Sequence, residues 1–178
     1  MAKMKQKQGK RNAAVNLEEE KAAVLKIVSK LIHANSHRSE VYRRCFNKSA
    51  APELRSVFNR NYATGISNIT ALTTEVIHLG FDGPFKETSR ELFFKVLMEL
   101  RTAISGNGVK ALLNNCYEAE EHTWHSYYQA TQSKILFKHP SLLEKLSVQL
   151  EEIAATKEAI ANMMLEMMGE RMKSPSRG

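Results

Sequence analysis

The chain has 178 residues, 43% of them hydrophobic and 25% charged, so it is long enough to bury one core of ordinary size. Only 4 Pro and 8 Gly interrupt it, which favours long helices over many short strands. No apolar run approaches the roughly 18 residues of a membrane-spanning helix, and no hydrophobic segment follows the basic start as in a secretory signal. Two distant cysteines, Cys45 and Cys116, do not suggest a disulfide framework. We expect both to be small buried side chains in a reducing cytoplasm.

The net charge of +7 is concentrated at the two ends of the chain. Residues 1–12 carry five bases and no acid, residues 170–178 carry three bases and one acid, and residues 13–169 are neutral. We therefore predict a disordered basic tail over 1–15, one domain over 16–169 and a second disordered tail over 170–178. The simplest interpretation of the first tail is a solubilising terminus. Contact with nucleic acid or anionic lipid is the alternative.

Hydrophobic periodicity predicts four long helices and one shorter helix. They cover residues 17–47, 52–79, 86–104, 109–132 and 141–168. Short loops join the first two and the last two helices, so each of these pairs should form an antiparallel hairpin. The connection between the hairpins is much longer and holds the short apolar helix. This is the ferritin-like arrangement of a four-helix bundle, and an all-α ferritin-like bundle is the predicted fold class.

A polar break interrupts each of the four apolar stripes at mid-height. The residues expected to meet there in one buried layer are Asn35, Arg38, Tyr42, Asn61, Glu120, Thr123 and Lys157. Four-helix di-metal proteins use several carboxylates and two histidines at this level, whereas Glu120 is the one inward carboxylate here. With Arg38 and Lys157 the predicted layer has a formal charge of +1, which opposes divalent cations. We therefore predict a buried ion-pair network in which Arg38 or Lys157 holds Glu120.

Histidine and glutamate side chains also cluster outside the predicted core. The candidates are His33, His37 and Glu40 in the first helix and Glu118, Glu121, His122 and His125 in the helix over 109–132. Because most of them lie opposite the apolar stripes, we predict ordinary solvated helix faces with local Glu/His pairing. The alternative is a surface or inter-subunit Zn²⁺ or Cu²⁺ site, since imidazoles at a spacing of one turn can chelate such ions.

Motifs for catalysis are missing from the sequence. It contains no Gly-rich phosphate loop, nucleophile elbow, Cys-x-x-Cys or His-Glu-x-x-His, so no catalytic residue is assigned. Met163, Met164, Met167 and Met168 cover more than one face of the last helix. Such a Met-rich end favours packing against another surface, and a homodimer through apolar, Met-rich helix faces is the partner that it suggests.

Residues of about 20–168 resemble the bacterial ferritin-like proteins called domain of unknown function 2383. The resemblance is carried by Leu31, Ile32, Tyr42, Pro52, Glu53, Leu54, Ala103, Ile104, Ser105, Gly106, Cys116, Glu120, Glu121 and Tyr127. It implies a ferritin-like bundle with Glu120 at a characteristic acidic position, and it implies no established activity. The chain departs from the family at Lys157, where relatives carry a histidine, and in having no inward acid on its second helix.

The sequence thus favours a non-enzymatic structural, interaction or stress-associated protein without a cofactor, in which a buried polar layer replaces a di-metal centre. One alternative is a metal-binding ferritin-like protein that holds iron or zinc through Glu120 or the outer His/Glu clusters. The second alternative is a binder of anionic surfaces that acts through the basic tail.

Overall fold

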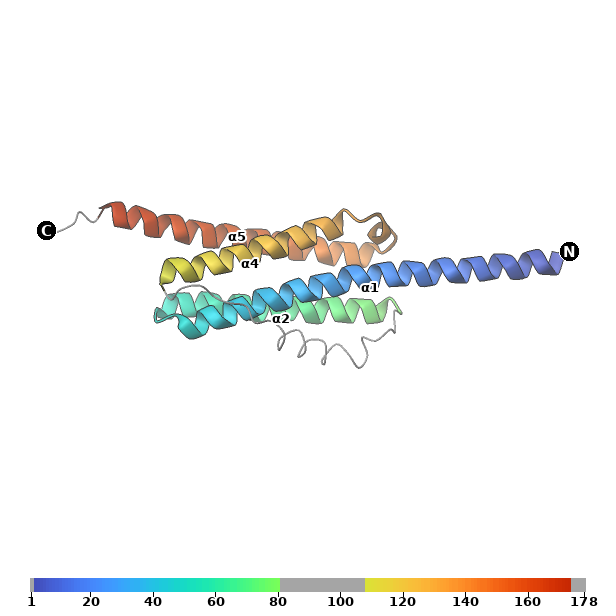
Figure 1. Cartoon of the computed structure of the whole chain (residues 1–178), viewed down its shortest axis with the longest axis horizontal. Coiled ribbons are helices and arrows are strands. Elements are labelled where there is room, and N and C mark those ends of the chain that lie inside the picture. The colour runs from blue at the N-terminus through green and yellow to red at the C-terminus, as the bar shows by residue number, and fades with distance from the viewer. Residues whose placement is uncertain (1, 81–107, 174–178) are drawn as a thin grey trace.

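The described part of the chain is entirely helical. A computed structural model describes residues 2–80 and 108–173, with side chains over 16–80 and 108–168. The elements are α1 (Ala2–Lys48), α2 (Pro52–His78), α4 (Val109–Thr131), the short 3-10 helix η1 (Lys134–Lys138) and α5 (Pro140–Lys173), as shown in Figure 1. The prediction of an all-α protein with four long helices in two hairpins is confirmed. The helix predicted over 86–104 lies outside the described residues.

Two helices are longer than the sequence predicted. α1 begins at Ala2 instead of near Asn16, and α5 continues to Lys173 instead of ending near residue 168. Residues 2–15 are rich in Lys, Gln and Ala, which are good helix formers, so the apolar stripe marks the packed part of α1 rather than its whole length. α2 has the boundaries that its sequence predicted, with Pro52 in its first turn and Gly80 at a φ of 71° just beyond its end.

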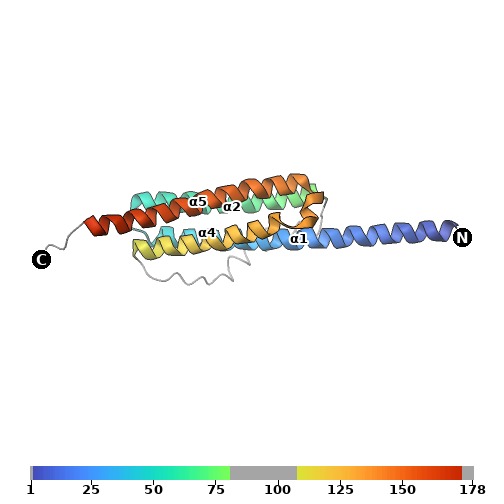
Figure 2. The same ribbon diagram turned by 90° about the horizontal axis from the view of Figure 1, so that it is seen from above.

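The four long helices lie nearly parallel to one axis, as Figures 1 and 2 show from two sides. α1 packs against both α2 and α4, and α5 packs mainly against α4. The side between α2 and α5 is the least closely packed of the bundle. α2 ends at one end of the bundle and α4 begins at the other (Figure 1). None of the described helices combines the length and the apolarity needed to cross a membrane.

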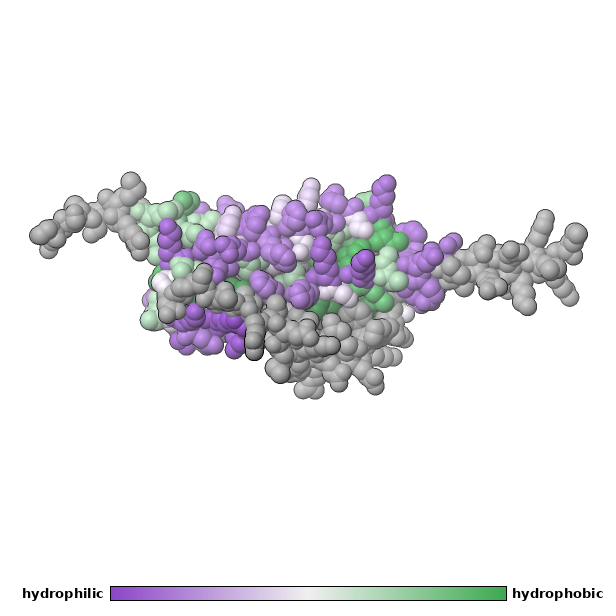
Figure 3. Space-filling model, viewed as in Figure 1, coloured by the Kyte–Doolittle hydropathy of each residue, from purple (hydrophilic) through white to green (hydrophobic). Residues whose placement is uncertain are grey.

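The core consists of two apolar clusters stacked along the bundle axis. The members of the first that come from the long helices include Val28, Leu31, Ile69, Leu72, Leu146 and Ile153. The second includes Val41, Cys45, Phe58, Leu113, Cys116 and Ile160. On the face seen in Figure 3, hydrophilic residues cover the middle of the bundle and hydrophobic residues gather toward its two ends. The clusters leave a level between them, and that level holds the polar side chains described next.

Candidate functional site: a buried polar layer

A polar layer separates the two apolar clusters, as the sequence predicted. The predicted residues that the structure buries are Asn35, Arg38, Tyr42, Asn61, Glu120 and Thr123. They come from α1 and from α2 and α4, the two helices that pack against it. The Thr123 hydroxyl also lies 3.4 Å from the backbone carbonyl of Ala34, so α1 and α4 approach each other closely here.

Glu120 is the centre of the layer. The Arg38 Nε donates a hydrogen bond of 2.7 Å to Glu120 Oε1, and the Tyr42 hydroxyl donates one of 2.6 Å to the same oxygen. Both members of the Arg38–Glu120 ion pair have fully buried side chains. Burial raises the pKa of Glu120, whereas the Arg38 charge and the two hydrogen bonds act in the opposite direction. Burial, with the neighbouring Glu120 charge, raises the pKa of Tyr42 well above its ordinary value, so the phenol is a hydrogen-bond donor at neutral pH.

The layer keeps unused hydrogen-bonding capacity. Nη1 and Nη2 of Arg38, Oε2 of Glu120, Oδ1 of Asn35 and Oγ of Ser39 are buried without a hydrogen-bond partner. A guanidinium has five N–H donors, and Arg38 uses the one on Nε. Arg38 therefore holds Glu120 through a single bond, not through the two-pronged geometry that fixes a carboxylate most firmly.

A second hydrogen-bonded chain runs through the layer from α1 to α5. Asn35 Nδ2 donates to the Tyr127 hydroxyl at 2.7 Å, and this hydroxyl donates to Gln149 Oε1, also at 2.7 Å. Burial raises the pKa of Tyr127. Gln149 is a buried member of the layer that the sequence prediction missed, and it supplies the contribution of α5.

Lys157 is not in the layer, so its prediction was wrong. Its side chain is 23% exposed, and its Nζ lies 2.7 Å from Glu121 Oε2 and 4.5 Å from the ring centroid of Trp124. The reason is a rotation of α5. The stripe predicted from periodicity shares Leu146, Ile153 and Ile160 with the buried stripe, but it extends to Leu143, Leu150 and Lys157, whereas the buried stripe extends to Leu142 and Gln149 on the other side. With one base and one acid, the layer is formally neutral instead of carrying a charge of +1.

The predicted solvated face of α1 is only partly solvated. His33 is exposed, but His37 is half-buried and Glu40 is buried, so the prediction was wrong for these two residues. Burial acts to raise the pKa of Glu40, but hydrogen bonds from Arg43 and Arg44 outweigh it and lower the pKa.

His37 meets a histidine of another helix. Its ring centroid lies 5.9 Å from that of His122 in α4. Burial lowers the pKa of His37, and the nearby charges of His122, His33 and Arg44 lower it further.

The four candidates of α4 lie on exposed surface, as predicted. Glu118 accepts a hydrogen bond from Asn114, Glu121 pairs with Lys157, and His125 bonds to Gln129, so the predicted Glu/His pairs are replaced by other partners. Within residues 16–80 and 108–168, no group of three or more His, Cys, Asp or Glu side chains is placed to hold a metal ion. The arrangement of the described side chains therefore adds no support to the metal-binding alternative.

Comparison with known proteins found no relative of this chain. No protein-family model, no curated protein and no solved structure matches the chain. The resemblance drawn from short sequence motifs therefore stays a prediction.

Proposed function

We propose that this chain is a non-enzymatic, ferritin-like interaction protein with a role in stress, and that it associates with a second copy of itself through the face formed by α2 and α5. The observation that carries the proposal is the open seam between these two helices. Every other neighbouring pair of long helices is closely packed among the described residues, whereas α2 and α5 touch only loosely. A loosely packed side is where a helical bundle can accept further helices.

The polar layer supports a non-catalytic role. Its single carboxylate is already neutralised by Arg38 and hydrogen bonded by Tyr42, and both charged side chains are fully buried. A substrate would have to separate α1 from α4 to reach Glu120. In this proposal the layer instead fixes how α1 and α4 pair, because a buried charge is stable only opposite its partner.

Two hollows lie along the α2–α5 seam. The larger, of about 670 Å³, contains Thr64, Ser67, Ala71, Val148 and the buried Asn68, whose amide nitrogen has no hydrogen-bond partner. The smaller, of about 190 Å³, is lined by residues that include Val57, Ala155, Thr156, Ala159 and Met163. Half of the residues that line the two hollows have small side chains, so the backbone of another helix could approach closely there, and the apolar side chains among them could pack against it.

The charges along the seam favour a second copy as the partner. Glu144 and Glu152 of α5 line the larger hollow together with Lys145, which is paired with the buried Glu75 at 2.6 Å, and Arg60 of α2 lines the smaller hollow. A two-fold axis across the middle of the seam would bring the acidic end of one copy to the basic end of the other. An isologous interface of this kind uses the same patch twice, and here the patch is complementary to itself.

Sedimentation equilibrium over a range of protein concentrations tests the proposal. We expect the wild-type chain to dimerise and Ala155→Glu, which places a charge in the smaller hollow, to be monomeric. Ala63→Glu is the matched control, because Ala63 is an exposed alanine of α2 that lines neither hollow. A wild-type chain that stays monomeric at high concentration, or equal association of the two variants, would overturn the proposed interface.

A charge exchange tests the arrangement of the two copies. Arg60→Glu should weaken the dimer by placing an acid opposite Glu152 of the other copy, and adding Glu152→Arg should restore it. If the double variant associates no better than Arg60→Glu alone, the two copies do not meet in the two-fold arrangement described above.

A further inference from the structure

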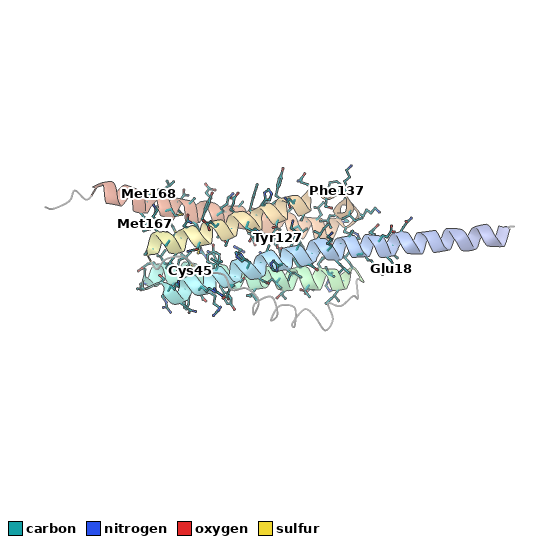
Figure 4. All side chains as sticks on the ribbon, viewed as in Figure 1. Glu18, Cys45, Tyr127, Phe137, Met167 and Met168 are labelled. Carbon is teal, nitrogen blue, oxygen red and sulfur yellow. The ribbon has the colours of Figure 1, made fainter. Side chains whose placement is uncertain are left out.

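The two cysteines are far apart in the sequence but adjacent in the structure. Cys45 of α1 and Cys116 of α4 are both fully buried in the second apolar cluster. The Cys45 thiol donates to the backbone carbonyl of Leu112 at a Sγ–O distance of 3.6 Å, and Leu112 lies one turn before Cys116. The two thiols are also close enough for each to shift the pKa of the other. Figure 4 shows Cys45 toward the same end of the bundle as Met167 of α5.

The packing of α1 against α4 at this pair bears on disulfide chemistry. A disulfide needs Cα atoms about 4.4–6.8 Å apart, which is closer than most helix pairs allow. α1 and α4 approach closely through small side chains, among them the buried Ala34 and Ala119. The Cys45 thiol and the Thr123 hydroxyl each reach a backbone carbonyl of the opposite helix. The contact therefore brings two thiols to one helix interface, and a disulfide there requires the Cα atoms of Cys45 and Cys116 to come within the range above.

We propose that Cys45 and Cys116 form a reversible intramolecular disulfide and that this thiol pair is a redox-sensitive site of the protein. The oxidant class is a hydroperoxide. Cys45 attacks the terminal oxygen of the peroxide, the O–O bond breaks, and an alcohol (water, from hydrogen peroxide) leaves as Cys45 becomes a sulfenic acid. Cys116 then attacks the Cys45 sulfur and loses its proton, the S–O bond breaks, and water leaves. The two thiols together lose two electrons, and the peroxide gains them.

The environment of the pair distinguishes the two sulfurs. The hydrogen bond between the thiols lowers the pKa of Cys45, and the same bond together with burial raises the pKa of Cys116. Since the thiolate is the nucleophile, these directions favour Cys45 for the first attack, and the reaction balances equally if Cys116 attacks first. Both sulfurs are buried, so the peroxide reaches them when the helix ends at this level open, and the reaction should be slow compared with that of an exposed thiol.

The disulfide would couple oxidation to stability. It closes the chain from residue 45 to residue 116 and ties the first hairpin to the second. A cross-link over so long a loop restricts the unfolded chain strongly and should raise the melting temperature by about 10 °C. Oxidation would thus tighten the bundle without requiring either helix to move far. The inference does not depend on the proposed dimer, because neither cysteine lines the α2–α5 seam.

The test uses the full chain treated with hydrogen peroxide under native conditions. We expect an intact mass lower by two hydrogen atoms, a proteolytic fragment pair that joins the peptides of Cys45 and Cys116, and the higher melting temperature. Dithiothreitol should reverse all three changes. Cys45→Ala, Cys116→Ala and the double variant should show no such change in mass or melting temperature, and alanine fits in place of a small buried thiol.

Three results would overturn the proposal. The thiols could remain reduced in the folded protein and react only after denaturation. The cysteines could link different molecules, which non-reducing electrophoresis would show as a covalent dimer. The double variant could gain as much thermal stability from peroxide as the wild type, which would assign the effect to other residues. A monomeric protein that still forms the internal disulfide would reject the proposed dimer and retain this site.

Discussion

Glu120 and Glu121 are neighbours on α4, and each accepts a hydrogen bond of 2.7 Å from a cationic side chain of another helix. Glu120 points into the bundle and meets Arg38 of α1, with both side chains fully buried. Glu121 points outward and meets Lys157 of α5, with side-chain exposures of 48% and 23%. The two N–O distances are equal, but the two ion pairs contribute differently to stability, because only the inner pair has been removed from water. The inner pair is hard to separate, and the outer pair can exchange its partner for solvent.

The largest expected effect is that of Glu120→Ala. The substitution strands the buried Arg38 charge and removes the acceptor of Tyr42, so the free energy of unfolding should fall by about 3–5 kcal/mol. Urea denaturation of Glu120→Ala and of the matched control Glu121→Ala measures the difference. The control should lose less than about 1 kcal/mol, because its pair is exposed. Similar losses for the two variants would contradict the assignment of inner and outer pairs.

A substitution at Gly65 tests how closely α2 packs against α1 at the level of the polar layer. A Cβ added to Gly65 would overlap the Ser39 Oγ of α1, so with this hydroxyl in place α2 can pack this closely only with glycine. Alanine favours a helix by about 1 kcal/mol over glycine, but overpacking in a buried contact costs about 1–3 kcal/mol. We expect Gly65→Ala to destabilise the bundle.

The double variant Gly65→Ala/Ser39→Ala separates the steric effect from propensity. Removing the Ser39 hydroxyl should recover most of the loss, which a double-mutant cycle in chemical denaturation would detect. If Ser39→Ala does not relieve Gly65→Ala, the overlap is absorbed elsewhere, and the close approach of α1 to α2 is less strict than the packing indicates.

His37 gives the stability of the bundle a pH dependence. Its pKa is lowered in the folded protein by burial first, and then by His122, His33 and Arg44. Between the lowered value and the ordinary value of about 6.5, the unfolded chain binds more protons, so stability falls as the pH decreases. His37→Gln should make this decline shallower between about pH 7 and about pH 5, as measured by denaturation at each pH. An unchanged slope would mean that the half-buried ring is protonated without cost.

The predictable and unpredictable parts of the site have different physical origins. α1 and α4 each have one well-defined apolar stripe, so the inward positions of Arg38 and Glu120 followed from helical periodicity alone. α5 has leucines at 142, 143, 146 and 150, and these allow two overlapping stripes whose centres differ by about 30°. The choice between them depends on packing against α4, so Gln149 was missed and Lys157 was misplaced. The contact of Cys45 with Cys116 needs the pairing of α1 with α4, which no local pattern encodes.

The smallest expected effect on stability is that of Lys157→Ala, which removes one member of the outer ion pair. Had it been in the layer, Lys157→Ala would strand a buried carboxylate and cost several kcal/mol. On the surface it loses one exposed ion pair with Glu121 and one contact with the Trp124 ring, and the loss should be about 1 kcal/mol or less. A double-mutant cycle with Glu121→Ala should give a coupling energy near 0.5 kcal/mol that decreases in high salt, because solvent ions screen exposed charges. A coupling of several kcal/mol that salt does not change would show that Lys157 belongs to the interior, and the rotation of α5 would then be wrong.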